Sequence, residues 1–438
     1  MAVLGDAALR AWLLRAGKPD THSREGGLVE RLIAFGGLFV MMGLAWLMSA
    51  DRRHIRWRPI ATGLALQFVL ALVLLQTSLG RALFQTLGDV FLGLLAFVEV
   101  GAVFVFGTTD ASGARNTQLL TSFAFGTLPS IIFFSSLMSI LYHLGLMQLV
   151  VRAFAVVMRR TLGTSGAESL SVAANIFVGQ VEAPLVVQPY LLTMTLSELM
   201  AIMLAGFATV AGGVMAAYVK MGFEAGHLVT ASVISAPAAI VIAKILQPEV
   251  GEPLTRGRVA VEVEATTTNL IDAAATGALL GLKLAIQVAG IIIAFLAMIA
   301  LGEFLFQWVL GFFGSDLTLT QCVGYMFMPL AWMMGIEVAD CGIAGELLGL
   351  RLLSNEFIAY ARLAEMLEAG QALSPRTKVV LTYALCGFAN FGSIGVQIGG
   401  IGAIAPERHG DLARLGLRAM LGGMLACFMT ACVASIFY

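Results

Sequence analysis

The sequence NIFVGQVEAPLVVQPY, which begins at Asn175, places polar side chains in a strongly apolar part of the chain. Two amides and a carboxylate, from Asn175, Gln180 and Glu182, are costly in hydrocarbon unless they line a cavity or find partners. Gly179 and Pro184 disfavour a continuous helix here. Because broken backbone inside a membrane is tolerated only under cover of protein or water, the segment predicts a binding site.

The two polar side chains at the centre of this segment suit recognition of a polar solute. Gln180 offers both a donor and an acceptor, as the edge of a nucleobase does. Glu182 can accept from an N–H group and adds a negative charge. The alternative interpretation of Glu182 is a structural carboxylate satisfied by helix N-termini.

A second polar position, Thr209, lies in GFATVAGGVMAAYV. Gly206, Gly212 and Gly213 allow the helix to unwind there. Carbonyl groups of an unwound helix, together with the Asn175 amide, would coordinate a hard cation such as sodium. The alternative is close helix packing through small residues, which is common in membranes.

A third group of polar residues lies in the last quarter of the chain. Glu356 follows Asn355, and Phe388, Asn390 and Ser393 occur together in CGFANFGSIG. A carboxylate, an amide and a hydroxyl can hold vicinal hydroxyls such as those of a ribose, and an aromatic ring offers the sugar an apolar face. The alternative for each residue alone is a structural role in the core.

Composition identifies the class of protein. Of 438 residues, 59% are hydrophobic and 12% are charged, against roughly 25% charged in soluble domains. The net charge of -1 gives no basic surface for nucleic acid. The five cysteines form no CxxC pair, and we find no HExxH, nucleophile elbow or P-loop, so no enzyme chemistry is indicated. We expect a multi-pass, all-α membrane protein.

Apolar runs predict about eight spans, because a crossing helix needs roughly 20 apolar residues. Runs at 82–107 and 148–166 carry charges and are interpreted as interfacial helices. Runs at 169–192 and 322–356 are polar at intervals and are interpreted as two re-entrant hairpins. The predicted spans are 32–50, 59–79, 120–147, 196–220, 228–246, 278–313, 379–404 and 411–436, with a break in 379–404 at GFANFGSIG.

A hairpin followed by a broken helix occurs twice, which is typical of transporters built from inverted repeats. We therefore divide the chain into N-terminal scaffold spans with an interfacial helix (1–110), a first repeat with hairpin 1 (111–250) and a second repeat with hairpin 2 (251–438). The segment 7–16 is expected to be an amphipathic surface helix. Basic residues around Arg52 predict a cytoplasmic loop, whereas Arg351 and Arg376 fall on the side that this topology assigns to the periplasm.

Four segments in order resemble the concentrative nucleoside transporter family, over most of the chain beyond residue 85. They are NIFVGQVEAPLVVQPY, NLIDAAATGALLGLKLA at 269–285, NEF at 355–357 and ALCGFANFGSIGVQIGGIGAIAPERHGDLARLGLRA at 384–419. The resemblance implies eight spans, interfacial helices, two re-entrant hairpins and a homotrimer in the bacterial inner membrane, importing nucleosides with a cation gradient.

The resemblance also implies roles for individual residues. Residues expected at the nucleobase are Gly179, Gln180, Val181, Glu182 and Val214. Residues expected at the ribose are Glu356, Phe388, Asn390 and Ser393. Residues expected at sodium are Asn175 and Thr209, with the carbonyls of Val178 and Val210.

This sequence departs from the family pattern at three positions. Val181 stands where Thr or Ser is usual, and Gly213 and Gly392 stand where Ser is common, so the base preference is open. Sodium is the expected coupling ion, and a proton is the alternative. A passive channel and a membrane-embedded enzyme are further alternatives. A channel is disfavoured because the polar groups cluster at one central site and do not form a ring around a pore, and an enzyme is disfavoured because the sequence shows no catalytic set.

Overall fold

The computed structural model describes residues 26–109, 115–116, 119, 122–256, 267–311 and 318–438. Their regular elements are helices, apart from a short antiparallel pair of strands, β1 (Thr108–Thr109) and β2 (Arg115–Asn116). The predicted surface helix at 7–16 lies outside the described residues. Eight of the described helical segments are long and apolar enough to cross a membrane, which confirms the all-α multi-pass fold.

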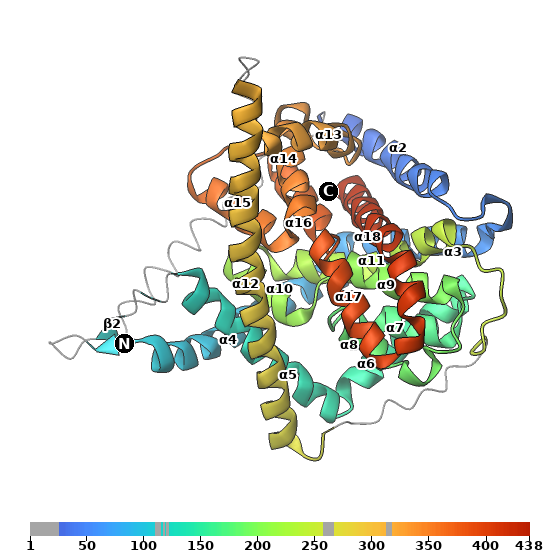
Figure 1. The fold of residues 1–438 in the computed structure, drawn as a ribbon, viewed down its shortest axis with the longest axis horizontal. Coiled ribbons are helices and arrows are strands. Elements are labelled where there is room, and N and C mark those ends of the chain that lie inside the picture. The colour runs from blue at the N-terminus through green and yellow to red at the C-terminus, as the bar shows by residue number, and fades with distance from the viewer. Residues whose placement is uncertain (1–25, 110–114, 117–118, 120–121, 257–266, 312–317) are drawn as a thin grey trace.

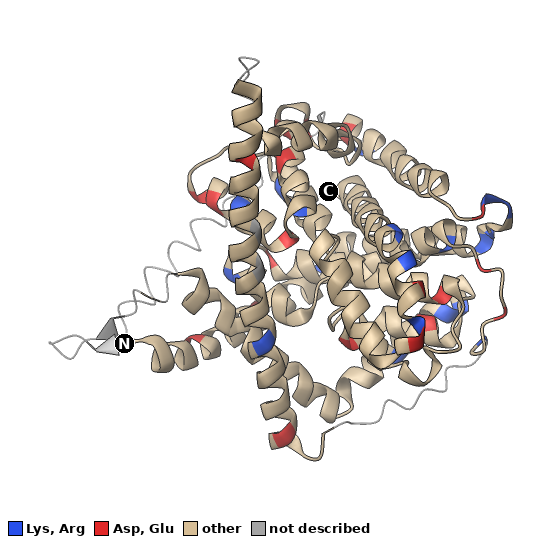
Figure 2. Ribbon diagram, viewed as in Figure 1, with Lys and Arg blue, Asp and Glu red and all other residues tan. Residues whose placement is uncertain are grey.

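The N-terminal part contains three long helices, α2 (Gly26–Leu47), α3 (Trp57–Gln76) and α4 (Ser78–Phe106). Lys and Arg gather at the turn between α2 and α3, around the short helix η1 (Arg52–His54) (Figure 2). Helix α4 is as long and apolar as a span. Figure 1 shows it lying across the direction of α12 rather than along it, so our interpretation of 82–107 as interfacial stays a prediction.

The next helices follow the short strands. A π-helical turn, η3 (Phe123–Thr127), precedes α5 (Leu128–His143), and Pro129 lies in the first turn of α5, where a missing N–H is tolerated. Helix α6 (Leu146–Leu162) is amphipathic, as an interfacial helix requires. Its buried face recurs every three or four residues, at Met147, Val151, Ala155, Met158 and Leu162.

The first repeat then forms its hairpin and broken helix. The first arm of the hairpin is α7 (Gly166–Ala174). After a turn, the second arm contains the short helices α8 (Glu182–Leu185) and η4 (Gln188–Tyr190). At nine residues α7 is far too short to cross alone. The broken helix consists of α9 (Leu196–Ala208) and α10 (Gly212–Lys220), and α11 (Ala225–Leu246) completes this almost wholly buried group.

Helix α12 (Leu270–Gly311) is longer than the predicted span at 278–313. Its 42 residues extend about 63 Å at 1.5 Å per residue, twice the thickness of the hydrocarbon core. Figure 1 shows α12 running along the outside of the molecule, where it packs on α5 and leaves most of its apolar surface exposed. Few of its residues are charged (Figure 2).

The boundaries predicted for hairpin 2 were wrong. The run 322–356 contains α13 (Leu319–Met333), η5 (Val338–Asp340) and α14 (Cys341–Leu353), and α13 packs against α14. The chain reverses again after α14 into α15 (Glu356–Glu368). Asn355 ends the run because its side chain accepts a hydrogen bond from the Ile358 amide at 2.9 Å and caps α15. Hairpin 2 is therefore the α14–α15 pair.

The second repeat ends with a broken helix and one long helix. The broken helix consists of α16 (Pro375–Leu385) and α17 (Phe391–Ile404), with the interruption where GFANFGSIG predicted it. After η6 (Pro406–Arg408), α18 (His409–Phe437) runs back through the core against α9, α11 and α16. The division of the chain at residues 110 and 250 stays a prediction.

Candidate functional site

Each hairpin is joined by one hydrogen bond to the broken helix of the other repeat. The Tyr218 hydroxyl on α10 donates to Glu356 Oε1 on hairpin 2 at 3.3 Å. The Gln397 amide on α17 donates to Gln180 Oε1 at the tip of hairpin 1 at 3.0 Å. The predicted polar breaks of the two repeats thus meet in one buried region.

Glu356 stands where two helices begin. It is the first residue of α15, and its Oε2 accepts from Asn390 Nδ2 at 3.0 Å. Asn390 caps α17 by accepting from the Ser393 amide at 2.9 Å. Because helix N-termini carry partial positive charge, both helices favour an anionic carboxylate here.

The Glu356 carboxylate keeps capacity for a ligand. A carboxylate offers about four lone-pair sites, and the side chains of Tyr218 and Asn390 and the backbone N–H of Glu356 itself occupy three of them. The Ser393 hydroxyl makes no hydrogen bond within the described part of the chain. The remaining acceptor site and this hydroxyl can each hold one of a pair of vicinal hydroxyl groups.

Aromatic packing fixes the wall behind Glu356. Tyr218 stacks on Tyr360, with ring centroids 4.2 Å apart, and contacts Phe357. The Tyr360 hydroxyl donates to the carbonyl of Thr382 on α16 at 2.5 Å. The wall therefore connects α10, α15 and α16 and sets the position of the carboxylate.

Burial accounts for two arginines that ran against the expected topology. Arg351 and Arg376 fall on the side assigned to the periplasm, and both are buried and bond backbone carbonyls. Arg351 on α14 donates to the carbonyls of Ala384 at 2.5 Å and Gly387 at 3.1 Å, which end α16. A cation at a helix C-terminus is favourable, so Arg351 holds the break of the second repeat against hairpin 2.

Gln180 is buried and pairs with Gln397, whereas the neighbouring Glu182 is exposed. A Cβ on Gly179 would fall 2.3 Å from Glu182 Oε2, so this carboxylate lies directly over the hairpin backbone. The backbone amides of Val181 and Glu182 at the start of α8 donate to it, so the alternative of a structural carboxylate satisfied by a helix N-terminus stays open beside the binding role.

A group of unpaired oxygens lies where hairpin 1 meets the break of the first repeat. Asn175 is fully buried, and neither Oδ1 nor Nδ2 has a hydrogen-bond partner among the residues that the structure describes. The Gly212 amide donates to the Phe177 carbonyl at 3.1 Å and joins the two segments. The carbonyls of Val178 and Val210 accept no hydrogen bond within the described residues.

This donor set fits a cation. Thr209 ends α9, and its hydroxyl donates to the Ala205 carbonyl at 2.9 Å, which leaves the oxygen lone pairs available. Buried side-chain amides are rarely left without partners, so the Asn175 carboxamide calls for an explanation. Neutral carbonyl, amide and hydroxyl oxygens are the ligands that a hard monovalent cation takes in unwound helices.

The remaining predicted site residues differ in exposure. Val214, near the start of α10, is buried, and Phe388 is half-buried in the break of the second repeat. Val181 is half-buried against α17, since a Cβ on Gly400 would lie 2.6 Å from one of its methyl groups. Their contact with a base or sugar stays a prediction.

Replacing Val181 by threonine tests its assignment to the nucleobase. The two side chains have the same shape, so the packing on Gly400 is kept while a hydroxyl is added. One additional hydrogen bond, worth about 1 kcal/mol, will change the relative inhibition constants of competing nucleosides by about fivefold. Sodium activation of uptake should be unchanged; a changed sodium dependence would show that our map of the two sites is wrong.

A buried ionic network fixes the foot of hairpin 1. Lys244 on α11 contacts Glu168 Oε2 at 2.7 Å and Ser197 Oγ at 3.0 Å, and Ser165 Oγ donates to Glu198 at 2.5 Å. Ser165 also caps α7 through a reciprocal bond with Glu168. The network holds the hairpin to α9 and α11 and thereby positions its tip.

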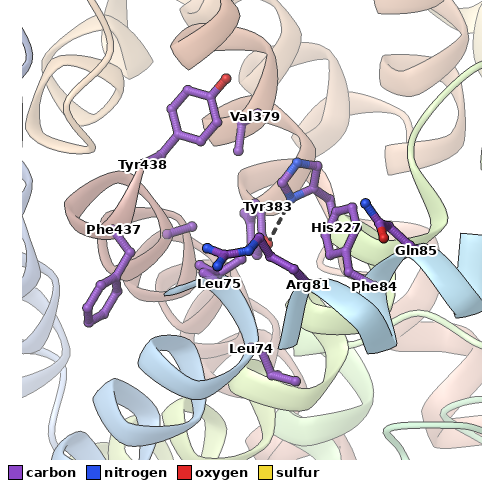
Figure 3. A pocket seen from close by; sticks show the side chains of 11 residues that line it. Leu74, Leu75, Arg81, Phe84, Gln85, His227, Val379, Tyr383, Phe437 and Tyr438 are labelled. Atoms are coloured by element: carbon purple, nitrogen blue, oxygen red, sulfur yellow. Dashed lines mark hydrogen bonds between the residues drawn. The ribbon is translucent and has the colours of Figure 1, made fainter. Parts of the chain in front are cut away.

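A cavity of about 240 Å³ lies elsewhere, between the α3–α4 turn and helices α11, α16 and α18 (Figure 3). Arg81, His227 and Tyr383 line it, and His227 Nδ1 lies 3.1 Å from the Tyr383 hydroxyl. None of the residues predicted to bind a base, sugar or cation lines this cavity.

Sequence reasoning missed Tyr218, Arg351 and Gln397. Tyr218 and Gln397 stand inside the motifs that drew our attention, but their partners come from the other repeat. Arg351 carried a signal, because a charge in an apolar helix must find partners. We took it as a mark of topology instead.

Models of known protein families match most of the chain. "Na+ dependent nucleoside transporter N-terminus" matches residues 36–109, "Nucleoside recognition" matches 124–223, and "Na+ dependent nucleoside transporter C-terminus" matches 227–435. An "Uncharacterized transporter" of Haemophilus influenzae is 42% identical over 92% of this chain and 96% of its own length. The mouse "Solute carrier family 28 member 3" is 41% identical over 93% of this chain, which spans 59% of the mouse protein.

Solved structures agree with these matches. CNTnw in an inward-facing substrate-bound state has a TM-score of 0.85 at 40% identity, over 94% of this chain and 98% of that chain. A doubly substituted CNTnw in an outward-facing state has a TM-score of 0.87 at 40% identity, over 93% of this chain and 99% of that chain. Together with the paired hairpins and broken helices, these similarities show that the chain belongs to the Na+-dependent (concentrative) nucleoside transporter family.

Proposed function

We propose that this protein is a sodium-driven nucleoside symporter that imports nucleosides by alternating access. The observation that carries the proposal is the meeting of the two hairpins and the two broken helices around Glu356 and Gln180. The ribose hydroxyls bind Glu356, Asn390 and Ser393, and the base lies toward the tip of hairpin 1. Family models and mammalian relatives named for sodium-dependent nucleoside transport support this assignment.

Sodium is the cotransported ion in this proposal. It binds the oxygens of Asn175 and Thr209 with the carbonyls of Val178 and Val210, which belong to hairpin 1 and to the α9–α10 break. Binding there orders the hairpin tip that carries Gln180, so the ion and the nucleoside depend on the same element. With one charge per cycle, 100 mV contributes about 2.3 kcal/mol, which supports about 50-fold accumulation.

Alternating access follows from the same geometry. The site is built from short, interrupted elements, each too short to span the membrane, and these can tilt or slide as a group against the longer helices. CNTnw has been captured in inward-facing, outward-facing and intermediate states. We propose that the protein works as a homotrimer in a bacterial inner membrane, with lipid and partner subunits covering the exposed apolar surface of α12.

Uptake by purified protein in liposomes tests the proposal. We expect labelled uridine to accumulate above its external concentration when sodium is high outside, and accumulation to collapse when an ionophore dissipates the sodium gradient. Accumulation driven by a pH jump in sodium-free buffer would instead support proton coupling. Equilibration without accumulation under every gradient would show a passive channel.

A further inference from the structure

Gln397 on α17 is a fully buried amide between the two repeats. Its Nε2 lies 3.0 Å from Gln180 Oε1 and 2.9 Å from the backbone carbonyl of Met203 on α9. Its Oε1 has no hydrogen-bond partner in the described part of the chain. One nitrogen therefore faces the hairpin tip of the first repeat and the first half of the broken helix at once.

The Met203 carbonyl fixes which way both amides point. A backbone carbonyl can only accept, so the atom of Gln397 that faces it must be the nitrogen. The same nitrogen faces Gln180, so the atom that Gln180 presents to it must be the oxygen. Turning Gln397 over would place its oxygen against two other oxygens and leave its donors without acceptors, which is far less favourable.

Glycine at position 206 makes this contact possible. A Cβ there would lie 2.6 Å from Gln397 Nε2 and 2.8 Å from Gln180 Cβ, so any larger residue would force the two amides apart. The Gln180 oxygen is thereby occupied, while its Nε2 donates no hydrogen bond within the described residues. Gln180 keeps 9% exposure, so it has access to a ligand.

We infer that Gln397 is a specificity-determining residue that makes Gln180 a hydrogen-bond donor toward the base. The inference rests on the proposed function. With the ribose at Glu356 on hairpin 2, the part of the nucleoside that reaches hairpin 1 is the base edge farthest from the sugar. In pyrimidines this edge carries the substituent at C4, and in purines the substituent at C6. A donor there selects bases that carry an oxygen at that position over bases that carry an amino group.

Two pairs of nucleosides test the inference because they differ mainly in this edge. Uridine and inosine carry the oxygen, and cytidine and adenosine carry the amino group. We expect the wild-type protein to bind uridine more tightly than cytidine, and inosine more tightly than adenosine, by on the order of tenfold. Inhibition constants against labelled uridine uptake in sodium-driven liposomes give both ratios.

Gln397→Glu should abolish the preference. The carboxylate that this substitution introduces has no donor for the Gln180 oxygen or for the Met203 carbonyl, so it is repelled by that carbonyl and no longer fixes the orientation of Gln180. Both ratios should then fall by about tenfold, toward one. Gln397→Met, which fills the same space without polar atoms, leaves Gln180 free to turn and should bring both ratios close to one.

The outcomes separate this inference from the proposed function. Uptake with the same two ratios in wild type, Gln397→Glu and Gln397→Met would overturn the inference, while nucleoside transport itself would stand. A wild-type protein that transports none of the four nucleosides would overturn the proposed function. A general structural defect would lower the affinities for all four nucleosides together and leave both ratios unchanged. A substitution that changes the uridine-to-cytidine ratio in one direction and the inosine-to-adenosine ratio in the other would also contradict our assignment.

Discussion

Glu356→Gln will remove most of the affinity for ribose-bearing solutes. The carboxylate accepts from Tyr218, from Asn390 and from its own backbone N–H, and it keeps an acceptor site for the sugar. Glutamine has one acceptor oxygen, and its amide nitrogen would face donors that now find no acceptor. Loss of hydrogen bonds to a charged group, each worth about 1.5–3 kcal/mol, predicts at least a 10- to 100-fold rise in the KM of uptake.

The measurement is concentration-dependent uridine uptake in sodium-driven liposomes. Glu365→Gln on the same helix is a matched control, because Glu365 is exposed and its carboxylate lies 3.5 Å from the Arg362 guanidinium, outside the site. Its KM should equal that of the wild type. Wild-type KM in Glu356→Gln would remove Glu356 from the ribose site.

Asn175→Leu will abolish sodium dependence without destabilising the protein. The two side chains have nearly the same shape, and leucine removes two buried polar atoms that have no partner within the described ranges. Replacing unsatisfied buried polar groups by apolar ones is nearly neutral or stabilising. A ligand that binds only the native state raises its stability, so sodium should raise the unfolding temperature of the wild type and not of the variant.

Thermal unfolding of purified protein with and without sodium tests this prediction alongside uptake. Thr209→Ala should lower sodium affinity by about tenfold through loss of one ligand. Thr382→Ala is its control, because the Thr382 hydroxyl likewise donates to the carbonyl four residues earlier, that of Lys378, at 2.8 Å. Thr382 lies on α16, outside the proposed cation site, so its replacement should leave the sodium affinity unchanged. A sodium-dependent rise in unfolding temperature that persists in Asn175→Leu would contradict the assignment of the cation site.

The local sequence was sufficient to predict the two breaks of the first repeat. Glycine and proline around Gln180 and Thr209 interrupt helices wherever the chain packs, so the hairpin at 169–192 and the α9–α10 break could be placed from residue types alone. The break in 379–404 was found for the same reason. Such signals depend on backbone geometry and not on distant partners.

The features that sequence reasoning missed depend on contacts between the repeats. The apolar run 322–356 hid the turn between α14 and α15, because Asn355, which caps α15, carries no signal that separates it from other asparagines. The partners of Arg351 are carbonyls, which every residue carries, so nothing in the sequence identifies them. The orientation of Gln180 depends on Gln397, 217 positions away.

A structure of the protein with bound sodium and uridine tests the central claim most directly. We predict the ribose within hydrogen-bond distance of Glu356 and Asn390, the uracil O4 edge facing Gln180 Nε2, and a sodium ion beside Asn175. Uridine bound in the cavity beside Arg81 and His227, or on one repeat alone, would contradict a single site shared by the two repeats.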